Sequence, residues 1–142
     1  MALGTNAHLR YNGTEAMAVN SKVDARTFSL CHQPTGQIIA TVQRLDGWLA
    51  KGIGVIGRAE MPMGTGVWLP GVASVHTCFV KFPLDLIFLD RDFRLLKTVA
   101  DVPPWRVWVT CPRAWHTIEM GAGTLPETRL LAPGDQWILD PD

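Results

Sequence analysis

The sequence predicts an α+β fold rich in β-structure, in which short strands form a curved antiparallel or mixed sheet, or a small barrel, with two short helices. Short apolar runs recur along the chain between turns rich in Pro, Gly and Asp, a pattern typical of strands. Only two segments carry helical signals. The chain has 142 residues, of which 47% are hydrophobic, and a chain of that length buries a core without a metal or a disulfide.

The first predicted elements are a hairpin and a helix. Residues 27–33 and 37–43 are rich in β-forming side chains and flank a Pro-Thr-Gly turn, which predicts a hairpin. Apolar residues within 45–56 recur at helical spacing, and we expect Trp48 to face the core from this helix. Two glycines near the end of the segment weaken the helix and indicate close packing against another element.

The pattern of the remaining residues predicts strands separated by proline-containing breaks. Thr124 and Glu127 match a capping box and predict a second short helix over 125–131. The segment 105–111 is apolar but carries two tryptophans, so it is either a strand or a packed loop. The other expected strands are residues 67–69, 72–80, 84–89, 94–102, 114–120 and 136–140.

The predicted organisation is an arm followed by one domain. Residues 1–25 lack apolar periodicity and are expected to form a flexible N-terminal arm, with a single globular domain over 26–142. The start of the chain lacks the pattern of a signal peptide, and no apolar run approaches the ~18 residues of a membrane span. We therefore expect a cytoplasmic protein as the chain is written, or a secreted one if a leader has been trimmed, and no membrane partner.

Charge and motif content exclude several function classes. Lys+Arg and Asp+Glu number 13 each, so the balance lacks the basic excess typical of nucleic-acid binders. Zero net charge and only 18% charged residues favour self-association, so a homo-oligomer is possible. The three cysteines form no CxxC pair, and the sequence contains no GxSxG, GxGxxG, P-loop or HExxH motif. No cofactor and no metal are expected.

An ordered series of motifs occupies most of the chain. It consists of GIGVIGR at 52–58, MP at 61–62, SVHT at 74–77, PLDLIFLD at 83–90, PWR at 104–106, IEMGAGT at 118–124 and PGD at 133–135. In order and spacing this series resembles the "domain of unknown function 192" family of small prokaryotic proteins over roughly residues 38–140. The resemblance implies a β-rich α+β domain and no assigned reaction. Family members often have Pro-Cys shortly before the SVHT motif, whereas this chain has Pro70-Gly71, which argues against an essential thiol there.

His76 and Asp85 are the candidate catalytic residues. Side chains alternate along a strand, so His76 lies on one face of the predicted strand 72–80. Asp85 lies in an apolar run, where a buried carboxylate needs a partner. Two interpretations are open: Asp85 orients His76 for proton transfer, or Asp85 instead caps a turn or binds backbone N–H groups around Phe82-Pro83.

The candidate binding residues lie on the same strand and on nearby loops. Loop arginines are suited to binding a carboxylate or phosphate, or they fix a loop by pairing with an acidic neighbour. Trp105 belongs to a tryptophan-rich segment that either lines an aromatic groove or packs in the core. We place His116, in contrast, on a strand surface. The expected binding residues are Arg58, Thr77, Lys81, Trp105, Arg106 and Glu119.

These residues favour a non-catalytic small binding or accessory domain that recognises an unknown small molecule, a glycan or a protein. The alternative is a small acid–base or metal-assisted enzyme centred on His76 and Asp85, and a third possibility is a structural subunit of an oligomer. The enzyme requires a concave pocket lined by His76 with a second titratable group within hydrogen-bond reach, and the absence of such a pocket would weaken this hypothesis strongly.

Overall fold

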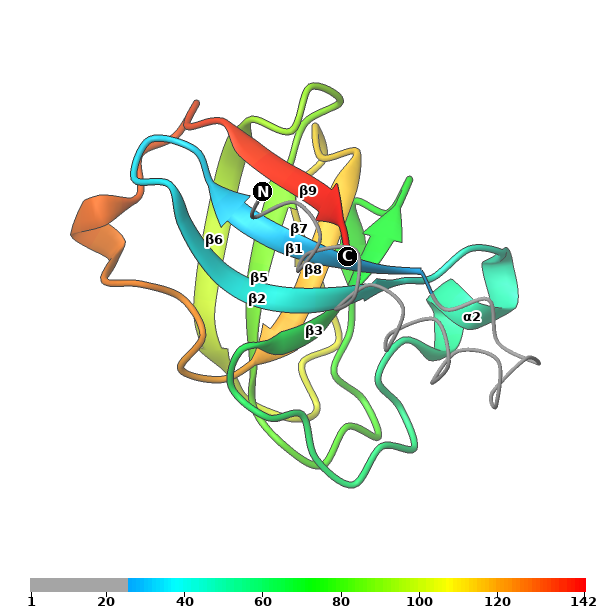
Figure 1. Ribbon diagram of the computed structural model, residues 1–142. Coiled ribbons are helices and arrows are strands. Elements are labelled where there is room, and N and C mark those ends of the chain that lie inside the picture. The colour runs from blue at the N-terminus through cyan, green and yellow to red at the C-terminus, as the bar shows by residue number, and fades with distance from the viewer. Residues whose placement is uncertain (1–25) are drawn as a thin grey trace, which may run out of the picture.

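A seven-stranded mixed sheet organises residues 26–142, the part of the chain that the computed structural model describes. The sheet curls into an open half-barrel (Figure 1) with the strand order β6-β5-β8-β3-β2-β1-β9. The predicted arm, residues 1–25, lies outside the described residues. The strands of this sheet are β1 (Thr27–His32), β2 (Gln37–Arg44), β3 (Thr65–Pro70), β5 (Leu84–Leu89), β6 (Leu95–Val102), β8 (His116–Gly121) and β9 (Trp137–Pro141).

The connection between β2 and β3 contains the α-helix, α2 (Trp48–Ile53). These two strands pair in parallel, whereas the other pairs of the sheet are antiparallel. A parallel pair needs a long crossover, and residues 45–64 supply it. Figure 1 shows α2 to one side of the sheet. Within residues 26–142, no helix has the length and hydrophobicity needed to cross a membrane.

Two hydrophobic cores cover the two faces of the sheet. The central strands β5 and β8 are buried at every position, as expected for strands covered on both sides. Along β5, Leu86 and Phe88 belong to the first core, while Ile87 and Leu89 belong to the second. The alternation along each strand therefore decides which core a side chain enters.

The β-rich prediction is confirmed, with one short α-helix in place of two. The predicted hairpin forms from β1 and β2, and the predicted strand 84–89 matches β5. The predicted helix 125–131 reduces to a 3₁₀ turn over Thr128–Leu130. The hydroxyl of Thr124, the expected cap, instead accepts the Gly64 N–H and donates to the Gly121 carbonyl, so it ties two loops together.

The predicted burial of Trp48 and the predicted strand 72–80 are both wrong, because contacts with distant parts of the chain decide these features. Trp48 is 86% exposed, and α2 buries none of its residues. The predicted strand 72–80 is paired only over β4 (Ser74–Val75), which forms a small second sheet with β7 (Val109–Thr110). Beyond β4, Thr77 is held by a distant loop rather than by a neighbouring strand, which ends the pairing.

Candidate functional site

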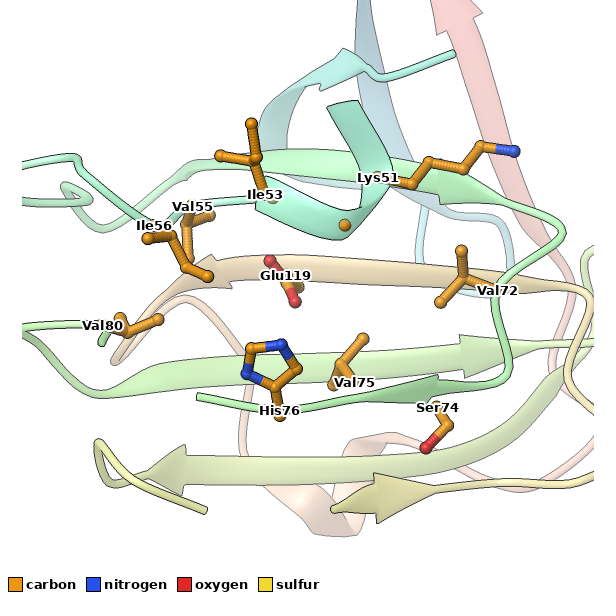
Figure 2. A pocket seen from close by; sticks show the side chains of 12 residues that line it. Lys51, Ile53, Val55, Ile56, Val72, Ser74, Val75, His76, Val80 and Glu119 are labelled. Atoms are coloured by element: carbon orange, nitrogen blue, oxygen red, sulfur yellow. The ribbon is translucent and has the colours of Figure 1, made fainter. Parts of the chain in front are cut away.

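A small cavity lies between the α2 region and the first core, and it brings together the side chains of Glu119 and His76 (Figure 2). Its volume is about 110 Å³. The cavity is lined by Lys51, Gly52, Ile53, Gly54, Val55, Ile56, Val72, Ser74, Val75, His76, Val80 and Glu119. Apart from Glu119, His76, Lys51 and Ser74, the lining residues are glycine, valine and isoleucine.

Glu119 lies at the centre of the sheet, on the buried strand β8. Its neighbours across the strand pairs are Val67 on β3 and Leu86 on β5, both fully buried. The carboxyl group is only 4% exposed, and its Oε2 atom has no hydrogen-bond partner among the described residues. Burial raises the pKa of Glu119 to about 7, while the positive charge of Arg58 lowers it.

His76 directly follows β4 and points toward Glu119 (Figure 2). Its ring is half-buried, and Nδ1 has no hydrogen-bond partner within the described chain. The next residue, Thr77, fixes this position. The Thr77 N–H donates to the Arg106 carbonyl at 2.9 Å, and its hydroxyl donates to the Pro103 carbonyl at 2.7 Å and accepts the Arg106 N–H at 2.9 Å.

A glycine allows the backbone after α2 to approach the carboxylate. Gly54 has a φ of +52°, in the left-handed region that favours glycine. A Cβ atom placed on Gly54 would lie 3.2 Å from Glu119 Oε2. The absence of a side chain at position 54 therefore keeps space in front of the carboxyl group.

The charges around the cavity leave the carboxyl group without an ion pair. Lys51 lies at its edge, and its amino group points away from Glu119 (Figure 2). The guanidinium of Arg58 donates to Gln43 Oε1 at 3.4 Å. The described residues give Glu119 no salt bridge. The site therefore combines one carboxyl group and one imidazole with apolar walls.

Asp85 does not join His76, so the predicted His–Asp pair is corrected. In the register of β5 and β8, Asp85 lies opposite Met120, whereas Glu119 lies opposite Leu86. Asp85 therefore projects from the face of the sheet opposite to Glu119. Its oxygens accept the N–H groups of Asp101 and Leu125, each at 2.9 Å. Asp85 thus binds backbone N–H groups, as in the alternative interpretation, but the donors are distant in the sequence and do not belong to the expected turn at Phe82-Pro83.

The other predicted binding residues are dispersed. Thr77 is buried and fully engaged with the neighbouring loop. Lys81 and Trp105 line a separate shallow hollow, where Trp105 is 61% exposed. Arg106 lines a third hollow with Trp108. Only Glu119, and Arg58 through its charge, act at the His76 cavity.

His116 occupies a buried site rather than the expected strand surface. Its ring stacks on Phe93, and its Nδ1 accepts the Trp68 indole N–H at 3.2 Å. Burial, followed by the charge of Arg44, lowers the pKa of His116 to about 4. The prediction was wrong because β8 is covered on both faces.

The described residues bring together no group of three or more His, Cys, Asp and Glu side chains suited to hold a metal ion. Cys31, Cys78 and Cys111 are free and half-buried. The chemistry available in the cavity is therefore hydrogen bonding, charge pairing and proton exchange by Glu119 and His76.

The sequence is similar to a known protein family and to an individual known protein. The family model DUF192, described as "Uncharacterized ACR", matches residues 31–138. A segment of 47 residues is 40% identical to the UPF0127 protein PH1112 of Pyrococcus horikoshii, covering 33% of this chain and 40% of that protein. The aligned segment thus spans less than half of that relative.

Two solved structures share the fold. One is from Sinorhizobium meliloti 1021 and is described as "a putative transcription regulator"; it has a TM-score of 0.68 and 20% identity, covering 82% of this chain and 96% of that one. The other is a protein of unknown function from Novosphingobium aromaticivorans, with a TM-score of 0.64 and 19% identity over 79% and 83% of the two chains. At these identities the likeness concerns the fold alone.

Proposed function

The chain belongs to the DUF192 family, and we propose that it is a small-ligand-binding module whose site is the cavity between Glu119 and His76. The observation that carries the proposal is the pair of buried polar atoms, Glu119 Oε2 and His76 Nδ1, that face one cavity without a hydrogen-bond partner among residues 26–142. Lys81, Trp105 and Arg106 lie outside this site and take no part in the proposal.

The cost of leaving these two atoms without partners supports a binding role. Buried polar groups in folded proteins are nearly always hydrogen-bonded. Each one left unsatisfied costs about 1–3 kcal/mol, and a charged group costs more. Two such atoms at one cavity are explained if a ligand places its polar group between them. The valines and isoleucines of the walls then contact the apolar part of that ligand.

The second candidate function is an acid–base enzyme in which Glu119, in place of Asp85, acts with His76. A carboxyl group whose pKa is about 7 exchanges its proton near neutral pH, which suits a general acid or base. His76 lies in the same cavity and supplies a second group for proton transfer. This second candidate adds turnover to the binding proposed above and uses the same two residues.

A fragment screen tests both candidates. Isotope-labelled full-length chain is mixed with small cationic, neutral and acidic compounds, and amide shifts are followed by NMR. We expect hits that shift the resonances of Gly54, Val75 and His76 and that bind more weakly to Glu119→Gln. The matched control is Glu127→Gln, because Glu127 is exposed and pairs only with Arg129 among the described residues.

Hits confined to other surfaces, or hits unaffected by Glu119→Gln, would refute the binding proposal. Chemical conversion of a hit by the wild type, lost in Glu119→Gln and kept in Glu127→Gln, would establish the enzyme. Binding without conversion would favour the non-catalytic module.

A further inference from the structure

The geometry points to a small organic cation as the ligand: a primary ammonium on a short alkyl chain, with its nitrogen between Glu119 Oε2 and His76 Nδ1 and its chain against the valines of the cavity. This inference rests on the proposed function and specifies the chemical class that the site accepts. It follows from the charge, the hydrogen-bonding capacity and the size of the cavity.

The negative charge of Glu119 itself favours a cation, because the basic groups around the carboxylate leave it without an ion pair in the described part of the chain. His76 faces it from the segment after β4, Arg58 acts on it from the chain after α2, and Lys51 lies on α2 itself. None of these pairs with the carboxylate, since Arg58 is directed to Gln43 and the amino group of Lys51 points away. A bound ammonium would neutralise the buried carboxylate, whereas an anionic ligand would meet a like charge.

The hydrogen-bonding capacity of the two side chains agrees with the charge. An ionised carboxylate only accepts hydrogen bonds, and a neutral imidazole accepts at one of its two nitrogens. An ammonium group has three donors and no acceptor, so it can donate to Glu119 Oε2 and to His76 Nδ1 at the same time. A carboxylate ligand has no donor to offer either atom. A hydroxyl group has one donor and satisfies one of the two atoms.

The size of the cavity limits the alkyl chain. A volume of about 110 Å³ is smaller than the roughly 150 Å³ of an engineered cavity that admits benzene. This leaves room for the ammonium group and about three to five carbon atoms. Val55, Val75 and Val80 are buried residues of the wall, and each methylene that they cover strengthens binding about fourfold.

The test is a calorimetric and NMR titration of the full chain with linear alkylammonium ions from methylammonium to hexylammonium at pH 8. Alcohols and carboxylates of the same lengths are the comparison ligands. We expect affinity to rise with each methylene up to about four carbons and then to level off or fall. Alcohols should bind at least tenfold more weakly than the ammonium ions of the same length, and carboxylates should not bind.

Four variants locate the binding. Glu119→Gln should weaken alkylammonium binding at least tenfold while keeping the shape of the side chain. Gly54→Ala should weaken it as well, because the new Cβ would lie 3.2 Å from Glu119 Oε2. Gly57→Ala is its matched control, since Gly57 also has a positive φ but its Cβ would meet no atom within 4 Å. Gly57→Ala and Glu127→Gln should bind like the wild type.

The contradicting outcomes separate the two proposals. If alcohols or carboxylates bind this cavity as well as the ammonium ions do, the cationic class is wrong and the binding site stands. Alkylammonium binding that is unchanged in Glu119→Gln refutes both the cationic class and the proposed site. If no compound of any class shifts the resonances of Val75 and His76, both the class and the proposed function are wrong. Glu119→Gln decides the question even if Gly54→Ala fails to fold.

Discussion

Replacing Glu119 by glutamine should remove a specific pH dependence from the stability of the protein. In the folded state the pKa of Glu119 is raised from 4.5 to about 7, chiefly by burial. Between these two values the folded state keeps a proton that the unfolded state releases. The free energy of unfolding therefore falls as the pH rises from about 4.5, and the loss is complete above about pH 7.

The size of this loss follows from the shift. A change of about 2.5 pKa units, at about 1.4 kcal/mol per unit, corresponds to about 3 kcal/mol. Glutamine resembles the protonated acid in shape and carries no charge at any pH. Glu119→Gln should therefore match the wild type near pH 4.5 and exceed its free energy of unfolding by up to about 3 kcal/mol at pH 8.

Urea unfolding followed by tryptophan fluorescence at pH 5, 6, 7 and 8 measures the difference between the two proteins. The difference, rather than the wild-type curve, is the informative quantity, because His116 titrates in the same range with the opposite sign. Glu127→Gln serves as the control and should run parallel to the wild type. A constant difference between wild type and Glu119→Gln from pH 5 to 8 would show that Glu119 is not desolvated as described.

Three further predictions concern residues outside the cavity. Burial lowers the pKa of His116 from 6.5 to about 4, so the free energy of unfolding decreases as the pH falls from about 6.5 toward 4. In the same urea experiment, His116→Gln should reduce this decrease, and an unchanged decrease would contradict the burial of His116. Asp85→Asn should lower the free energy of unfolding by about 1–3 kcal/mol, because the amide cannot accept both backbone N–H groups. The same variant should leave the NMR resonances of the His76 ring unchanged, since Asp85 projects from the face of the sheet opposite to Glu119, which shares its cavity with His76; shifted ring resonances would mean that Asp85 and His76 interact. Thr77→Val should also cost about 1–3 kcal/mol through two lost hydrogen bonds of its hydroxyl, and an unchanged free energy of unfolding would contradict this role.

Local patterns in the sequence were sufficient for the elements whose partners lie nearby. The hairpin of β1 and β2 needs only two β-rich runs and a turn, and β5 is an apolar run interrupted only by Asp85. Elements that depend on distant contacts were harder to predict. The helical spacing around Trp48 is real, but the helix is part of a crossover and leaves that residue exposed. Thr124 has the sequence of a helix cap, yet its hydroxyl ties two loops.

The candidate site, too, was predictable where it depends on local sequence and not where it depends on distant contacts. Alternation put Asp85 on a definite face of β5, but His76 lies beyond the end of β4, where alternation does not apply. Alternation also does not say which face of one strand matches which face of another. That relation is set by β8, which lies between β5 and β3 and comes later in the chain. Glu119 was among the expected binding residues, but its place in one cavity with His76 and Gly54 depends on three segments that are far apart in the sequence.

The ionisation of the Glu119 carboxyl group tests the central claim most directly. Carbon-detected NMR of the labelled side chain gives its pKa in the free protein and with saturating butylammonium. We predict a Glu119 pKa near 7 in the free protein and a pKa at least one unit lower with the cation bound, because a neighbouring positive charge stabilises the carboxylate. A pKa near 4.5 in the free protein that the cation leaves unchanged would contradict a desolvated carboxylate lining a ligand cavity.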